Sequence, residues 1–211
     1  MTTVESERRN HQNVVPSPSR QATFFLTGAL AGAASLPVDA AFLSLSQKPK
    51  QIFGITHIRS NLAAVLARTG IRFFSFDHVR TYSSHYLQLP TTLCGALGGA
   101  AGGLNEVILH SLVSNHRLPS WEAAASQSGK LFMCFGTYTY LSTNLSRELP
   151  PRPFWKCWLM GATAGFVGST ITAAIEGARS RALLSAALRG TFVIGTVISV
   201  QVTSCAASLS V

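Results

Sequence analysis

Long apolar segments alternate with short polar ones along most of this 211-residue chain. Most of the apolar segments reach the roughly 20 residues that a helix needs to cross a hydrocarbon core of roughly 30 Å. Prolines and clusters of polar residues separate them, as expected at helix boundaries. The pattern predicts six helices, at residues 22–45, 62–82, 91–113, 129–145, 154–179 and 183–209.

A small-residue pattern recurs at a fixed spacing in the first, third and fifth of these helices. It begins at Gly28, Gly95 and Gly161, so the three starts lie 67 and 66 residues apart. A fixed period of this kind indicates repeated structure. The chain is therefore expected to contain three tandem helix pairs around a pseudo-threefold axis. The repeats would span residues of about 22–88, 89–152 and 153–211.

Each copy of the pattern contains two glycines four residues apart, which places both on one face of a helix. In membrane bundles such a strip lets a second helix approach closely. The six residues are therefore predicted to be helix-packing positions. They are Gly28, Gly32, Gly95, Gly99, Gly161 and Gly165.

Composition favours an all-α membrane protein, because 47% of the residues are hydrophobic and only 12% are charged. The net charge of +9 is spread over the loops without a clustered basic run, which argues against nucleic-acid binding and for contact with a lipid bilayer. Residues 1–21 are polar and are expected to form a disordered tail before a transmembrane domain at 22–211. They lack the pattern of a secretory signal.

Motifs of enzymes and metal sites are missing from the sequence. There is no Gly-x-Ser-x-Gly, no His-Glu-x-x-His and no Cys-x-x-Cys, and the four cysteines lie singly in apolar segments. The sequence therefore predicts a protein that is not an enzyme, with neither a metal nor a cofactor.

Lone carboxylates mark the ends of the first, third and fifth helices, at Asp39, Glu106 and Glu176. A charge at membrane depth is costly, so such groups usually face a bundle interior or a water-filled cavity. We expect the three acids to point toward the bundle axis at similar depth. The alternative is that they are remnants that interact with loop lysines at the membrane surface.

The second helix is unusual because it carries four ionisable residues. A lipid-facing helix would not contain so many charges, so one side of it must face protein or a cavity. Arg72 is the candidate for binding a small anionic solute, and the alternatives are pairing with a neighbouring acid or snorkelling to the interface. The four residues are Arg68, Arg72, Asp77 and Arg80.

These features resemble the mitochondrial carrier family, whose odd helices carry the signature Pro-x-Asp/Glu-x-x-Lys/Arg. The signature is found here, in part, as Pro37-Val38-Asp39, as Leu104-Asn105-Glu106, and as Ala174-Ile175-Glu176 followed by Arg179. The even helices of that family carry an aromatic-acid-x-x-base motif. The stretch Phe76-Asp77-His78-Val79-Arg80 matches it completely.

The resemblance implies transport of a small metabolite across the mitochondrial inner membrane. It also implies that charged residues form gates that close a central cavity alternately toward each side. The gate or cavity charges would be Asp39, Glu106, Glu176, Arg179, Asp77 and Arg80.

The chain departs from the family where the gates should form. Phe42 and Leu109 occupy two of the basic positions, and the even-helix motif is uncharged around Tyr140 and Gln201. Full rings of ion pairs are therefore not expected. On the side of the termini, Asp77 should pair within its own helix or bond to Tyr138 or Tyr140, leaving that side leaky or open.

Two functions follow from these observations. One is a carrier-like protein that moves a small anionic metabolite. The other is a non-transporting scaffold or accessory subunit that binds partners in a membrane complex and has lost the gate charges. A third candidate, the inner-membrane protein translocase family, also has glycine-stepped helices, but it usually has four of them, so a count of six argues against it.

Overall fold

Six α-helices and no strand make up the part of the chain that this computed structural model describes, which is residues 18–46, 55–115, 118–144, 152–177 and 180–209. The all-α fold class and the number of helices agree with the sequence pattern. The helices are α2 (Pro18–Ser46), α3 (Ile55–Tyr86), α4 (Thr91–Asn115), α5 (Trp121–Asn144), α6 (Phe154–Ile175) and α7 (Ser180–Leu209).

Four helices begin earlier in the chain than the sequence pattern predicts, and the differences are largest at α2, α3 and α5. α2 begins at Pro18, since proline is well suited to a first helical turn, so residues 18–21 of the expected tail are helical. α5 begins at Trp121 because Glu and Ala favour helix, and the Ser120 hydroxyl accepts a hydrogen bond from the Ala123 amide. α3 likewise begins at Ile55 rather than at residue 62. The polar residues at these helix starts are helical, although their composition alone is typical of loops.

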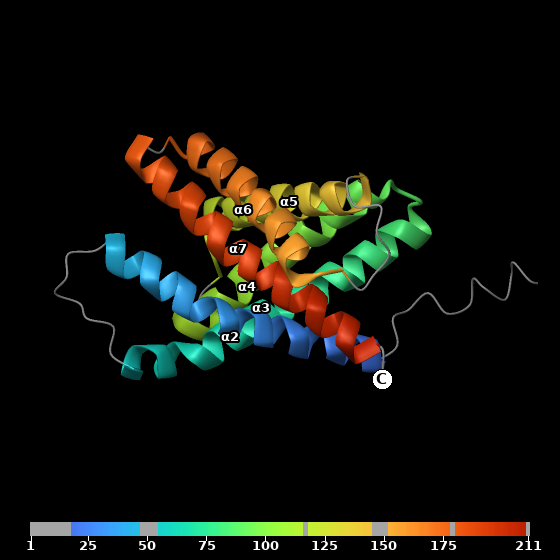
Figure 1. Ribbon diagram of the computed structural model, residues 1–211, viewed down its shortest axis with the longest axis horizontal. Helices are drawn as coiled ribbons and strands as arrows, with labels where there is room; N and C mark the ends of the chain where they lie inside the picture. The colour runs from blue at the N-terminus through green and yellow to red at the C-terminus, as the bar shows by residue number, and fades with distance from the viewer. Residues whose placement is uncertain (1–17, 47–54, 116–117, 145–151, 178–179, 210–211) are drawn as a thin grey trace, which may run out of the picture.

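The helices form a closed ring. Each packs along its neighbours in sequence and α7 packs along α2, and among the described residues no other pair of helices brings its backbones this close. In Figure 1 the end of α7 lies beside the start of α2, and Gln201 donates a hydrogen bond to Thr27 between them. The first turn of α2 and the end of α7 therefore lie on the same side, which we call the terminal side of the ring.

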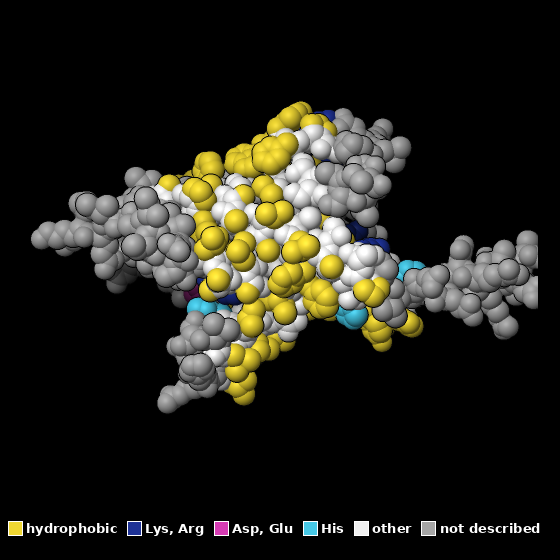
Figure 2. Space-filling model, turned by 90° about the horizontal axis from the view of Figure 1, so that it is seen from below, with side chains coloured by type: hydrophobic (Ala, Val, Ile, Leu, Met, Phe, Trp, Pro, Cys, Tyr) yellow, Lys and Arg dark blue, Asp and Glu magenta, His cyan; other side chains and the backbone are white. Residues whose placement is uncertain are grey.

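Four helices are long and apolar enough to cross a membrane, in the segments 18–38, 91–112, 154–175 and 182–205. Figure 2 shows one face of the molecule covered by hydrophobic side chains, with basic and histidine side chains toward its edges. An exposed apolar surface of this extent is characteristic of a membrane protein. The helices α3 and α5 contain more polar residues and fall short by this measure, so the predicted six spans are matched in four helices.

The repeated glycines lie at the contacts between paired helices. A Cβ atom at Gly32, Gly95, Gly99 or Gly165 would collide with the helix that follows, which is α3, α5, α5 and α7 in turn, and one at Gly28 or Gly161 would be tightly packed against α3 or α7. In each case the first helix of the pair, which is α2, α4 or α6, uses its two glycines to approach the helix that follows it in the chain. The spacing of four thus places a close contact in each of these three helix crossings.

A second strip lies three and seven residues after the start of each pattern, and its glycines contact the preceding helix. Gly98 and Gly102 approach backbone carbonyls of α3, and Gly168 approaches α5. The remaining equivalent positions are also small and buried. They are Ala31, Ser35 and Ala164.

Candidate functional site

A cavity of about 370 Å³ lies inside the ring, between α2, α3, α4, α5 and α7. Its lining residues come from the later parts of α2 and α4 and from the earlier parts of α3, α5 and α7. The cavity therefore occupies the half of the bundle that is distant from the terminal side.

Positive charge dominates this cavity. Four cationic side chains line it, and Glu106 is the carboxylate among the lining residues. Each cation comes from α3, α5 or α7, so the charge is gathered from three different helices. The cations are Arg68, Arg72, Lys130 and Arg189.

Arg72 and Glu106 form an ion pair within the cavity. The Arg72 Nε and Nη2 atoms lie 2.8 and 2.5 Å from Glu106 Oε2. Gln127 Nε2 donates a third hydrogen bond to the same oxygen, at 3.1 Å. The two charged side chains are only 11% and 13% exposed, so water screens their attraction weakly. Of the three uses proposed for Arg72, pairing with a neighbouring acid is the one this structure contains.

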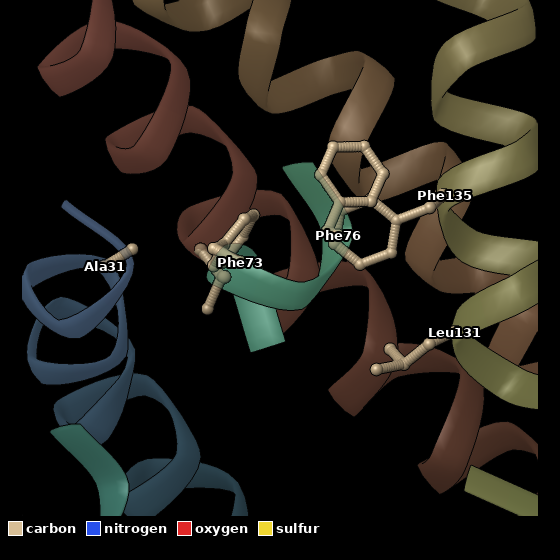
Figure 3. Close-up of a cluster of buried hydrophobic side chains, with 6 residues drawn as sticks. Ala31, Phe73, Phe76, Leu131 and Phe135 are labelled. Carbon is tan, nitrogen blue, oxygen red and sulfur yellow. The ribbon is translucent and has the colours of Figure 1, made fainter. Parts of the chain in front are cut away.

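A hydrophobic cluster closes the cavity toward the terminal side. In Figure 3 the Phe73 and Phe76 side chains of α3 lie near the Phe135 side chain of α5. The Phe135 ring centroid is 5.7 Å from that of Phe73 and 4.5 Å from that of Phe76. α3 and α5 are not neighbours in the ring, so these rings meet across its centre. The cluster consists of Ala31, Phe73, Phe76, Leu131, Phe135 and Val197.

The prediction that Asp77 pairs within its own helix or bonds to a tyrosine is wrong. Arg20 of α2 contacts it, with Arg20 Nη2 2.9 Å from Asp77 Oδ1, and neither Tyr138 nor Tyr140 bonds to it. The pair was missed because residue 20 was assigned to a disordered tail. With α2 starting at Pro18, its first turn lies beside the later half of α3. This pair and the hydrophobic cluster both pack on the terminal side, and the expectation that this side leaks stays a prediction.

The three lone acids do not share one environment. Glu106 lines the cavity, whereas Glu176 follows the end of α6, is exposed, and accepts a hydrogen bond from Ser126 at a groove between α5 and α6. The expectation of a common direction is therefore wrong for Glu176. The Asp39 side chain and Arg179 lie outside the described residues.

Arg80 is the last residue of the motif Phe76-Asp77-His78-Val79-Arg80 on α3. It is exposed and is not part of the cavity lining. Its guanidinium lies 5.9 Å from the centre of the Phe76 ring. The two charges of the motif therefore lie in different environments, because the Asp77 carboxylate is buried.

The sequence pattern singles out neither Gln127 nor Arg189, and it favours a place at the membrane interface for Lys130, which instead lines the cavity. Gln127 and Lys130 are three residues apart, which places them on one face once the helix is known to begin at Trp121. Arg189 is a cation within an apolar stretch of α7, a pattern that indicates an interior or cavity position. The sequence contains both the spacing of Gln127 and Lys130 and the cation at Arg189. The spacing is hard to recognise because the residues before 129 are polar and resemble a loop.

The fold and the cavity define an all-helical membrane protein with a cationic interior. Comparison of the chain with protein-family models, with curated proteins and with solved structures finds no match. The resemblance to the mitochondrial carrier family stays an interpretation of the motifs.

Proposed function

We propose that this chain is a carrier-like integral membrane protein that moves a small anionic solute through the centre of its helical ring. Six helices would span the bilayer as three pairs around a pseudo-threefold axis. The motif resemblance favours the mitochondrial inner membrane as its location.

The cationic cavity is the observation that carries this proposal. Beside the Arg72–Glu106 pair, the lining contains the cations Arg68 and Lys130, and neither forms an ion pair among the described residues. Cations inside a membrane protein are unfavourable unless they are hydrated or meet an anion. An anionic solute of cavity size would supply the missing charge, and it would be bound by side chains from several helices at once.

The polar composition of α5 is compatible with a membrane span, because its polar groups Gln127 and Lys130 line the cavity. Its two strongly exposed aromatic residues, Trp121 and Tyr140, are 19 positions apart. At 1.5 Å per residue that is roughly 29 Å, close to the roughly 30 Å of a hydrocarbon core. Aromatic side chains favour the two interfaces of a bilayer, so this spacing supports α5 as a fifth span.

The equivalent glycine contacts support the three-pair arrangement. In α2, α4 and α6 the two glycines four residues apart approach the following helix. Where the second strip contains a glycine, that glycine approaches the preceding helix. Closure of the cavity on the terminal side is what a carrier would show in one of its two end states.

Uptake by liposomes tests the proposal. Wild-type protein reconstituted in lipid should accumulate at least one member of a panel of small carboxylates and phosphates faster than protein-free liposomes do. The Lys130→Gln variant should lower that uptake at least tenfold, because it removes a cavity cation. Lys156→Gln is the matched control, since Lys156 lies over the Trp155 ring outside the cavity and should have little effect. Equal losses in both variants would contradict a role for the cavity.

The Phe135→Ala variant should make the terminal side permeable. Phe135 contacts both Phe73 and Phe76, so truncating it removes the ring that bridges α3 and α5. We expect efflux of a preloaded anion to rise at least tenfold over wild type, measured in the same liposomes. Phe166→Ala provides the control, because Phe166 is 46% exposed on the outside of α6.

A non-transporting accessory subunit is the second candidate. It is favoured by the way the terminal side is closed, since the ion pair there joins the adjacent helices α2 and α3 and does not reach across the ring. Failure of wild-type protein to accumulate any solute, together with its purification in a stable membrane complex, would establish this function instead.

A further inference from the structure

Glu106 is held as a bound carboxylate would be held. Three donors converge on its Oε2 atom, two from the Arg72 guanidinium and one from the Gln127 amide. Guanidinium and amide groups placed in this way recognise carboxylates with directional, charge-assisted hydrogen bonds. The carboxylate that occupies them belongs to the protein itself, and it lines the cavity proposed for the solute.

We propose that Glu106 is an internal competitor, and that the solute carries a carboxylate which displaces it from Arg72 and Gln127. This inference rests on the proposed function and names the chemical class of its solute. An incoming carboxylate can take over the same three donors, so the exchange conserves the hydrogen bonds of the site. No covalent step is involved.

Lys130 offers Glu106 a position after displacement. It lies one turn beyond Gln127 on α5 and lines the same cavity as Glu106. Among the described residues Lys130 forms no ion pair in this structure. A displaced Glu106 therefore has a cation to pair with, so its charge does not remain uncompensated inside the bundle.

The exchange also changes how two repeats are joined. Arg72 belongs to α3 and Glu106 to α4, which are the last helix of one proposed pair and the first helix of the next. The ion pair is one polar link between them, and the Asn105–Ser75 hydrogen bond of 2.8 Å is another. Solute binding would break the first link and keep the second, which lets binding energy favour a shift of α4 relative to α3.

Succinate binding to the purified full-length protein tests the inference. By isothermal titration calorimetry, Glu106→Gln should bind succinate at least tenfold more tightly than wild type, which corresponds to about 1.4 kcal/mol. Glu176→Gln, which removes a carboxylate outside the cavity, should leave the affinity unchanged. Succinamide, which has the same shape without charge, should not compete.

A simple change in net charge must be separated from the loss of a competitor. In an Arg72→Gln background, Glu106→Gln should give little or no gain, because the contested donor is gone. Glu106→Asp keeps the charge but shortens the reach to Arg72, so it should tighten binding several-fold. It also replaces Glu106→Gln as the test if that variant does not fold.

Three results would overturn the inference: equal or weaker succinate binding by Glu106→Gln and Glu106→Asp, no binding by either, or an equal gain in the Arg72→Gln background. Liposome uptake is read separately. Uptake by wild type without the affinity gain would reject the competitor and leave transport standing. The gain without uptake would establish the carboxylate site and reject transport.

Discussion

Replacing Arg20 with glutamine should destabilise the folded protein by about 2–3 kcal/mol. The Asp77 side chain is 4% exposed, so the change leaves a buried carboxylate without its cation, and breaking such a pair from one side usually costs about 3–5 kcal/mol. We expect about 2–3 kcal/mol, less than this usual range, because Arg20 is 47% exposed and water weakens the ion pair that is lost.

The reverse change should cost less. In Asp77→Asn the buried group becomes neutral, and the half-exposed Arg20 can turn to water, so we expect about 1 kcal/mol or less. Thermal or denaturant unfolding of the two variants in the same detergent measures the difference. Arg80→Gln is the control from the same helix, because Arg80 is exposed and should contribute under about 1 kcal/mol through the Phe76 ring. If Asp77→Asn is as unstable as Arg20→Gln, the asymmetry argument is wrong.

This ion pair illustrates where inference from the sequence ends. The six apolar segments were sufficient to predict the number and order of the helices, because membrane length fixes their size. The partner of Asp77 depends on which helix lies beside α3 and on where α2 starts. Neither follows from a local pattern, and a start at residue 22 would have removed Arg20 from the contact altogether.

Part of the candidate site could also be predicted from the sequence. Arg72 and Glu106 were recognisable because each is a charge in an apolar helix. Gln127 was hidden in a polar segment whose helical propensity was underestimated, and Arg189 was not singled out. Whether an acid faces the cavity or the outside depends on helix rotation, which is why Glu106 and Glu176 look alike in the sequence and differ in the structure.

Glycine spacing predicted close approach, and its energetic consequence can be tested with one substitution made at two places. A Cβ atom at Gly165 would meet the Gly190 carbonyl oxygen and lie 2.7 Å from the Ile194 Cβ atom. A Cβ atom at Gly190 would in turn meet the Ser169 hydroxyl and the Gly165 carbonyl oxygen. The atom nearest to a Cβ at Gly165 belongs to the backbone, so rotation of a side chain cannot make room there.

Gly165→Ala should therefore destabilise the protein by about 2–3 kcal/mol, near the upper end of the range for overpacked sites, because α6 and α7 must separate to admit a methyl group. Gly129→Ala is the matched variant. A Cβ atom at Gly129 of α5 meets no atom within 4 Å, so the same change there should stabilise the helix by about 0.5–1 kcal/mol. Unfolding midpoints of both variants measure the contrast. Similar midpoints would mean that the α6–α7 crossing is looser than the structure shows, and the argument for equivalent glycine contacts in three helix pairs would lose its third member.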